Sequence, residues 1–338
     1  MNDIIIRKFT NLLKQMRLDM KSNENNFRYM SIYKVLNIIK SFKKQITSID
    51  DVKDIPGIGK GSIRRISEIL KTGKLSELKN YSKNSDIYLK SIDNLIKIFG
   101  IGKKKAHELV MQYDIHSIND LKKLLKNKKI TLPDNIIKGL KYVNLTKTNI
   151  PRKEIDEIYV YLIQKVEEFD TDLNIYICGS YRRLKTTSND IDIILYHNKL
   201  KTKKQSEESD RMKKLVSILI DEGFIIENYT SLDVPTKFMG LCRKNKKGYI
   251  RRIDIRMMPY ESIHYATLYF TGSGDFNKIM RKKALDMGYT LNEYGLYNSN
   301  GDLVKKVINN EKDIFDILGI EYLPPHLREV GLSKTKIK

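Results

Sequence analysis

The stretch Asn189-Asp190-Ile191-Asp192, followed about sixty residues later by Arg252-Ile253-Asp254-Ile255-Arg256, decides the fold of this chain. In an extended strand alternate side chains share a face, so Asp190 and Asp192 point one way while the isoleucines beside them point into a core. Asp254 stands in a second stretch with the same alternation. The pattern predicts three carboxylates on two paired strands, an arrangement that can hold two metal ions.

A glycine-rich turn precedes the first carboxylate pair. The stretch Cys178-Gly179-Ser180-Tyr181-Arg182-Arg183 supplies small residues, backbone N–H groups and two cations, which suit a triphosphate. Alternating acids alone usually mark a solvated strand face. Together with this turn, however, they indicate a nucleotidyl-transfer site in which Mg²⁺ joins the carboxylates to a triphosphate.

The length and charge of the chain point to a multidomain protein with a polyanionic partner. With 338 residues, the chain suits two to four compact units. Its 63 Lys and Arg residues against 41 Asp and Glu residues give a formal net charge of +22, which favours nucleic acid as the partner.

The cysteines and the apolar patterning indicate the cellular setting. Cys178 and Cys242 are too few for a disulfide framework and lack the spacing of a zinc site. The chain has no long apolar run, and its first residues lack the pattern of a signal peptide. We therefore expect an intracellular protein that is neither secreted nor bound to a membrane.

A repeated glycine pattern lies in the first half of the chain. Ile55-Pro56-Gly57-Ile58-Gly59-Lys60 and Ile98-Phe99-Gly100-Ile101-Gly102-Lys103 each lead into an amphipathic stretch, as in a helix-hairpin-helix unit. Such glycines let the backbone approach a phosphate at the start of a helix. Neither copy has the βαβ context of a dinucleotide-binding loop, and neither has the Lys-Ser/Thr that ends the phosphate-binding loop of NTPases. We expect both hairpins to bind the DNA backbone without reading sequence.

The remaining patterns give an outline of the elements. Apolar spacing predicts two or three helices within residues 5–45, a linker over 144–153, a helix over 152–168 and strands over 173–178, 191–196 and 250–258. The polar segment 198–210 is expected to be an exposed loop. Near the end, Ser273 or Asp275 can cap a helix whose buried stripe is Phe276, Met280, Ala284 and Met287.

The order of these motifs resembles that of the family X DNA polymerases, of the polymerase beta type. The resemblance runs through almost the whole chain: both hairpins, Ile150-Pro151-Arg152, the turn at 179–183, the acids at 190–192 and 251–256, Tyr269-Phe270-Thr271-Gly272-Ser273, Phe276-Asn277-Lys278 and Thr290-Leu291-Asn292-Glu293-Tyr294. In combination these motifs are highly specific.

The resemblance implies a set of site residues. Asp190 and Asp192 would bridge two Mg²⁺ or Mn²⁺ ions, and Asp254 would bind the ion that activates the primer 3′-hydroxyl. The implied nucleotide contacts are Gly179, Ser180 and Arg183 for the triphosphate, together with Asn189, Tyr269, Phe270, Gly272, Asn277 and Arg281. The DNA contacts are Gly57, Gly59, Lys60, Gly100, Gly102, Lys103, Arg252 and Arg256, with a monovalent cation at the hairpin carbonyls.

The chain departs from the family pattern at several positions. Asn189 replaces a glycine before the first catalytic aspartate, Gly274 replaces a nucleotide-contacting aspartate, and Asn149 replaces an arginine. The family's lyase domains use a lysine where ungapped alignment places Arg65, and a guanidinium cannot form the Schiff base. Tyr33, Lys34, Lys60 and Arg65 would then form a 5′-phosphate pocket, with or without a lysine that takes over the lyase reaction.

We therefore expect a multidomain α and α+β protein. Its parts are a helical domain over 1–83, a helical DNA-binding subdomain over 84–148, a nucleotidyltransferase palm over 149–258 and a small α+β nucleotide-selecting subdomain over 259–338. The expected function is template-directed filling of short gaps in base excision repair, by a monomer acting on gapped or nicked DNA and dNTP. The alternatives are a template-independent nucleotidyltransferase and a non-catalytic scaffold that binds DNA ends.

Overall fold

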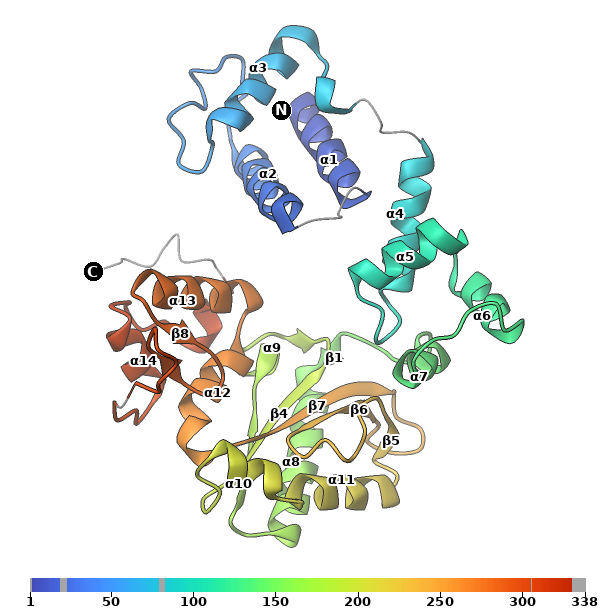
Figure 1. Cartoon of the computed structure of the whole chain (residues 1–338), viewed down its shortest axis with the longest axis vertical. Coiled ribbons are helices and arrows are strands. Elements are labelled where there is room, and N and C mark those ends of the chain that lie inside the picture. The colour runs from blue at the N-terminus through green and yellow to red at the C-terminus, as the bar shows by residue number, and fades with distance from the viewer. Residues whose placement is uncertain (1, 19–22, 79–82, 305, 330–338) are drawn as a thin grey trace. The chain divides into compact units, whose positions relative to one another are not determined.

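The computed structural model describes residues 2–18, 23–78, 83–304 and 306–329. Contacts divide the chain into two compact units, Met1–Ile136 and Ile137–Lys338, and each is considered by itself (Figure 1). The first unit is helical, whereas the second is a mixed sheet with helices on its faces, which confirms the expected fold class. The finer division into four parts stays a prediction.

The first three helices of the N-terminal unit share one apolar core. They are α1 (Asp3–Leu18), α2 (Asn23–Ser41) and α3 (Lys60–Thr72). Apolar residues at helical spacing supply the core, among them Phe9, Leu12, Ile32, Val35, Leu36, Ile39, Ile66 and Ile69. The helices expected within residues 5–45 are thus α1 and α2.

Four further helices, α4 to α7, follow in the described residues before β1 (Ile150–Pro151). They are α4 (Lys83–Leu95), α5 (Lys103–Tyr113), α6 (Ile118–Lys126) and α7 (Asp134–Tyr142), and α7 crosses the boundary between the two units. An ion pair of 2.8 Å between Lys14 and Asp86 joins α1 to α4. The start of α6 is capped by the Ser117 hydroxyl, which accepts from the backbone N–H of Asp120 at 3.1 Å.

A five-stranded sheet organises the second unit. Its order is β2 (Leu173–Ile177), β4 (Ile191–His197), β7 (Arg251–Met258), β6 (Lys237–Cys242) and β5 (Ile225–Asn228), and β4 and β7 pair in parallel while the other pairs are antiparallel. The three strands expected from the sequence are β2, β4 and β7, each within one residue of its predicted bounds.

Different helices pack on the two faces of this sheet. On one face, α8 (Arg152–Phe169) and α11 (Arg211–Asp221) pack on Ile191, Ile193, Ile253 and Ile255. On the other, α12 (Ile263–Thr271) covers Ile194 with Ile263 and Ala266 (Figure 1). Because side chains alternate along β4, Asp192 lies on the same face of the sheet as Ile194, the face on which α12 packs.

The last part of the chain forms a small subdomain around α12. It contains η2 (Tyr260–Ser262), α13 (Gly274–Asp286), β8 (Thr290–Leu291), β9 (Leu296–Tyr297), α14 (Glu311–Ile317) and η3 (Pro325–Leu327). Phe276, Met280, Ala284 and Phe315 share its core. Ser273 caps α13, because its hydroxyl accepts from the N–H of Phe276 at 3.4 Å.

Three expectations about local structure were wrong. Segment 198–210 is not a loop throughout, because Thr202 and Gln205 form a capping box that starts α10 (Lys203–Glu208). Met287 is 41 % exposed, since α13 ends at Asp286 and the stripe does not continue. Within the expected linker over 144–153, β1 (Ile150–Pro151) pairs with β3 (Thr187–Ser188).

None of the helices in the described ranges has both the length and the hydrophobicity that crossing a membrane requires.

Candidate active site

The register of the parallel pair brings the three carboxylates together. Asp192 of β4 lies directly opposite Asp254 of β7, and Asp190 stands immediately before β4. One carboxylate oxygen from each of the three lies within 4.8 Å of the others. Hard divalent cations prefer oxygen ligands of this kind. The described residues therefore form a site that can hold a metal ion, as the alternation of the two stretches predicts.

The positive charge closest to this triad is Arg252. Its Nη2 lies 2.6 Å from Asp254 Oδ2 and 3.3 Å from Asp190 Oδ2. Burial raises the pKa of Asp190, and burial together with Asp190 and Asp254 raises the pKa of Asp192 to about 7. Without a divalent cation the site thus favours a bound proton near neutral pH.

Gly179 permits the backbone to lie against the triad. It follows β2 with a φ of 57°, and a Cβ at this position would lie 1.9 Å from Asp192 Oδ2. Both the left-handed backbone and the lack of space require glycine. The preceding N–H of Cys178 donates to the Asp192 carbonyl at 2.8 Å, which fixes the turn to β4.

The turn after β2 forms the short helix α9 (Gly179–Arg182) beside a cavity of about 410 Å³. This cavity is lined by Gly179, Ser180, Arg183, Asn189, Asp190, Asp192, Tyr269, Phe270, Gly272, Gly274 and Asn277. The expected nucleotide contacts all lie on it except Arg281. The Ser180 hydroxyl donates to the Ser188 hydroxyl at 2.7 Å, and Arg183 donates to the Thr271 carbonyl.

Arg281 lies beside this cavity and contacts one of its residues, Tyr269. Its guanidinium carbon is 4.8 Å from the centre of the Tyr269 ring, and the Asn277 amide donates to the Tyr269 carbonyl at 2.7 Å. Tyr269 and Phe270 meet edge to face with ring centres 5.0 Å apart. The peptide bond from Gly272 to Ser273 is cis. The motif at 269–273 thus joins α12 to α13 at the edge of the cavity.

Acidic residues that the sequence analysis did not single out hold the arginines of the turn. Glu329 and Lys185 form an ion pair of 3.2 Å, and the same carboxylate accepts from Arg183. Glu311 accepts from Arg182 at 2.7 Å and from Arg328 at 2.9 Å. These acids lie far along the chain from the turn, so no local sequence signal identifies them.

The buried Glu311 carboxylate accepts hydrogen bonds from both Arg182 and Arg328. Burial alone would raise the pKa of Glu311, but the hydrogen bonds from Arg182 and Arg328 lower it. Arg182 also donates to the Thr271 hydroxyl at 2.7 Å. The network therefore anchors α9 to the start of α14 and to the end of α12.

The two hairpins of the first unit have the same backbone design. Gly57 and Gly100 have φ values of 97° and 85°, whereas Gly59 and Gly102 cap α3 and α5 with φ values of −86° and −82°. A Cβ on Gly59 or Gly102 would meet no described atom within 4 Å. The first glycine of each pair is needed for the turn, while the second leaves the helix start open to a ligand.

The predicted DNA contacts on β7 are already engaged within the protein. Arg252 binds two carboxylates of the triad, as described above. Arg256 lies 3.9 Å from Glu293, and its guanidinium carbon is 5.5 Å from the centre of the Phe270 ring. Their role toward DNA stays a prediction.

The four residues of the predicted 5′-phosphate pocket lie in different surroundings. Arg65 is 8 % exposed, and its guanidinium donates to Glu77 of η1 (Ser76–Leu78) at 3.1 Å. Tyr33 is 44 % exposed and stacks on Tyr29 with ring centres 6.4 Å apart. Lys60 instead lines a cavity of about 710 Å³ with Arg64. Lys34 is exposed on α2. Arg65 is thus buried and does not line the cavity that Lys60 and Arg64 share, although Arg64 also lies 3.9 Å from Glu77.

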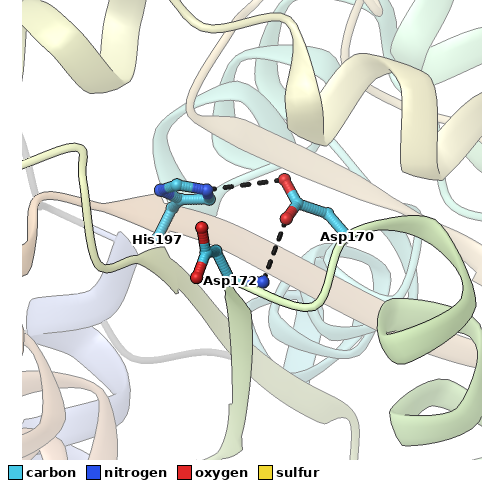
Figure 2. Close-up of side chains that lie close together, drawn as sticks. All are labelled: Asp170, Asp172 and His197. Atoms are coloured by element: carbon cyan, nitrogen blue, oxygen red, sulfur yellow. Dashed lines mark hydrogen bonds and ion pairs between the residues drawn. The ribbon is translucent and has the colours of Figure 1, made fainter.

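A second cluster of metal-ligating residue types contains Asp170, Asp172 and His197 (Figure 2). Its carboxylates already have cationic partners: Arg211 lies 2.8 Å from Asp170 and Lys199 lies 2.5 Å from Asp172. The His197 Nδ1 accepts from the backbone N–H of Lys199 at 3.0 Å, so its proton resides on Nε2, which faces Asp170 at 3.5 Å. This arrangement stabilises the end of β4 and leaves no imidazole lone pair for a metal.

Comparison with known protein families covers most of the second unit and part of the first. The model of the DNA polymerase beta palm matches residues 149–260, that of the DNA polymerase beta thumb matches 266–329, and a helix-hairpin-helix domain matches 7–75.

Three curated proteins show similarity over nearly the whole chain. DNA polymerase lambda of Arabidopsis thaliana is 31 % identical over 317 residues, covering 90 % of this chain and 58 % of the relative. DNA polymerase lambda of Rattus norvegicus is 30 % identical over 318 residues, covering 90 % and 53 %. DNA nucleotidylexotransferase of Xenopus laevis is 26 % identical over 341 residues, covering 89 % and 64 %. The chain spans less than two thirds of the length of each.

Proposed function

Since this chain belongs to family X of the DNA polymerases, we propose that it adds nucleotides from dNTP to a primer 3′-hydroxyl and fills short gaps in duplex DNA. The observation that carries the proposal is the triad of Asp190, Asp192 and Asp254 beside the cavity that Ser180 and Arg183 line. A metal site next to a phosphate-binding turn matches the needs of phosphoryl transfer.

The residues of the triad would hold two divalent ions. The three carboxylates Asp190, Asp192 and Asp254 would together supply the oxygen ligands. Two bound Mg²⁺ or Mn²⁺ ions would lower the pKa of the primer hydroxyl and neutralise charge on the triphosphate. The raised pKa of Asp192 supports this assignment, because a bound cation offsets both of its causes, the burial of the carboxylate and the repulsion from Asp190 and Asp254.

The other residues of the cavity would bind and orient the nucleotide. Arg183 offers a fork of donors to the triphosphate, and the Ser180 hydroxyl offers one more. Tyr269 and Phe270 would lie along the sugar. Asn277 and Arg281 would face the base and the template, since both contact Tyr269 at the edge of the cavity.

The two hairpins would hold the DNA backbone on either side of a gap, acting in a monomer with four parts as divided above. The open helix starts at Gly59 and Gly102 support this role, because backbone N–H groups and the helix dipole attract phosphate. The chain would act inside the cell, where Cys178 and Cys242, both buried and free, stay reduced.

Primer extension on two substrates, together with binding of gapped DNA, tests the proposal. We expect Mg²⁺-dependent addition of the templated nucleotide at a one-nucleotide gap with a 5′-phosphate, and much slower addition on a single-stranded primer. Equal, untemplated addition on the single strand would favour the nucleotidyltransferase alternative. Tight binding of gapped DNA without any addition in Mg²⁺ or Mn²⁺ would favour the scaffold.

A further inference from the structure

A larger cavity, of about 980 Å³, lies elsewhere in the second unit. Its volume is at the upper end of the range for pockets that hold small organic ligands. Residues that line it include Tyr176, Tyr196, Lys201, Lys203, Tyr260 and Tyr294. Among the described residues, none that lines this cavity also lines the cavity beside the carboxylates.

Helix α12 separates the two cavities on one face of the sheet. Asp192, Ile194 and Tyr196 of β4 share this face by alternation. α12 covers Ile194, so Asp192 is left on one side of the helix and Tyr196 on the other. Four residues of strand place their backbones roughly 13 Å apart. The larger cavity is therefore a separate site from the candidate active site.

Three tyrosines form a continuous aromatic surface in this cavity. Tyr176 of β2 stacks on Tyr196 with ring centres 5.8 Å apart and planes at 14°, and Tyr260 meets Tyr196 at 6.0 Å. Tyr176 is 46 % exposed and Tyr260 is 44 % exposed. The outer rings of the series thus present aromatic surface to the cavity, on which a further flat ring can stack.

Lys201 lies next to the aromatic surface at Tyr260, and Lys203 lies beside a fourth tyrosine of the cavity, Tyr294. The backbone N–H of Tyr260 donates to the Leu200 carbonyl at 2.9 Å, which holds the segment with Lys201 and Lys203 against η2. Lys203 Nζ lies 4.9 Å from the centre of the Tyr294 ring, and it also lies 3.6 Å from Glu207.

The lining of the cavity is cationic overall. It contains the cationic residues Arg182, Lys201, Lys203, Lys306 and Lys312 against the carboxylates Glu261 and Glu311. Arg182 and Glu311 bind each other, and Lys312 pairs with Asp316 outside the lining, so the excess positive charge comes from Lys201, Lys203 and Lys306.

We propose that this cavity binds a short single-stranded segment of nucleic acid. Bases would stack on Tyr176 and Tyr260, and phosphates would lie near Lys201 and Lys203. Exposed aromatic rings beside cations are the general means of holding unpaired strands. A duplex does not fit this surface, because its base faces already stack on one another. An acidic peptide would use the lysines but not the faces of the rings.

The test compares gapped duplexes with and without an unpaired oligo(dT) tail, using the full chain and fluorescence anisotropy. We expect the tail to strengthen binding by about fivefold or more, the effect of one good base stack. Tyr260→Leu and Lys203→Ala should lose this gain, while Tyr260→Phe keeps it. Binding of the duplex without a tail and primer extension should stay unchanged, which separates this site from the proposed function.

Lys204→Ala is the matched control. Lys204 is the next residue of α10, its side chain is 82 % exposed, and it is not among the residues that line the cavity. The variant has the same charge change as Lys203→Ala and should keep the whole tail effect. Loss of the tail effect in both variants would show that the effect depends on the net charge of the surface and not on this cavity, which would overturn the proposal.

Competition and cross-linking identify the ligand. A tail containing 5-iododeoxyuridine should cross-link under ultraviolet light to Tyr176 or Tyr260. Cross-links confined to the hairpins of the first unit would overturn the proposal. So would displacement of the tail by poly-glutamate as effectively as by oligo(dT). Displacement by thymidine monophosphate at concentrations similar to those of oligo(dT) would assign the site to a free nucleotide instead of a strand.

Discussion

The Arg183 guanidinium donates to the Glu329 carboxylate at the edge of the candidate active site, and a second donor of the same group is used by the Thr271 carbonyl. Burial would raise the pKa of Glu329, but the bond to Arg183 lowers it, so the acid is ionised near neutral pH. A triphosphate that binds Arg183 therefore competes with a carboxylate of the chain itself.

We expect Glu329→Gln to lower the KM for dNTP by about fivefold, because the amide is a weaker competitor by roughly 1 kcal/mol. The value of kcat should change little. Steady-state extension at a one-nucleotide gap measures both constants. Glu321→Gln, at an exposed position of the same segment, is the control and should behave as the wild type. An unchanged or raised KM in Glu329→Gln would show that the contact does not oppose nucleotide binding.

Substitution of the triad should separate catalysis from DNA binding. Asp190→Asn, Asp192→Asn and Asp254→Asn should each abolish extension, since each removes a charged metal ligand. Affinity for gapped DNA should be retained, because it depends on many phosphate contacts. Asp172→Asn, in the cluster of Figure 2, is the control and should stay active. Substantial extension by any of the three triad variants would refute the site assignment.

The raised pKa of Asp192 predicts a pH-dependent stability in the absence of metal. Between the ordinary value of 3.8 and about 7, the folded protein binds this proton more tightly than the unfolded chain. The contribution of this group to the free energy of unfolding therefore falls as pH rises through this range. Asp192→Asn removes the penalty, so in EDTA at pH 7.5 the variant should be more stable by about 1–3 kcal/mol.

Thermal unfolding followed by circular dichroism measures this difference. The stability gain of Asp192→Asn should shrink at pH 5, where the wild-type carboxyl is protonated. Mg²⁺ should raise the melting temperature of the wild type at pH 7.5 more than that of the variant. If the stability of the two proteins depended on pH in the same way, the ionised Asp192 carboxylate would not be destabilised in the folded state.

The hairpin glycines allow folding to be distinguished from DNA binding. Gly102→Leu should lower stability only by about 1 kcal/mol, since leucine caps α5 less well than glycine, while its φ of −82° and the lack of described atoms within 4 Å of the added Cβ impose no strain. It should nevertheless weaken binding of gapped DNA, because the side chain blocks phosphate from the helix start. Gly100→Ala should destabilise the unit by about 1–2 kcal/mol, as its φ is 85° and its Cβ would lie 2.8 Å from Ile136 Cγ1.

Binding is compared by anisotropy at several salt concentrations, and stability by urea unfolding. If Gly102→Leu binds gapped DNA as tightly as the wild type, the second hairpin is only a structural turn. Gly59→Leu gives the same test for the first hairpin, where the added Cβ is also unobstructed.

Borohydride trapping examines the lyase reaction. We expect little covalent product with DNA that carries a 5′-deoxyribose phosphate, because Arg65 cannot form an imine and is bound to Glu77. Gap filling should be unaffected. Efficient trapping that is lost in Lys60→Ala or Lys34→Ala would place the reaction on a lysine. Efficient trapping that is lost only in Arg65→Ala would contradict the chemical argument.

The triad could be predicted from the sequence because the face of each carboxylate is a local property of its strand, although the β4–β7 pairing that joins them is not local. Alternation fixes the face of Asp190, Asp192 and Asp254, and the buried isoleucines beside them fix the register. Glu329 could not be predicted, because nothing near Arg183 in the chain indicates which distant acid folds against it. The helix α10 was missed although Thr202 and Gln205 carry the capping signal, since the charge run around them masked it.

The parallel seam between β4 and β7 also has a consequence for the order of folding. β2 and β4 pair as neighbours along the chain, as do β5, β6 and β7, so each group closes over short loops. Within the described five-stranded sheet, only the β4–β7 junction joins segments that are far apart in the chain, and such contacts form late because loop closure is costly. We therefore expect Asp254 to meet Asp190 and Asp192 in the last step of sheet assembly. A nascent or partly unfolded chain would then lack the metal site. The repulsion among the three carboxylates would arise only after the other strands of the sheet have paired.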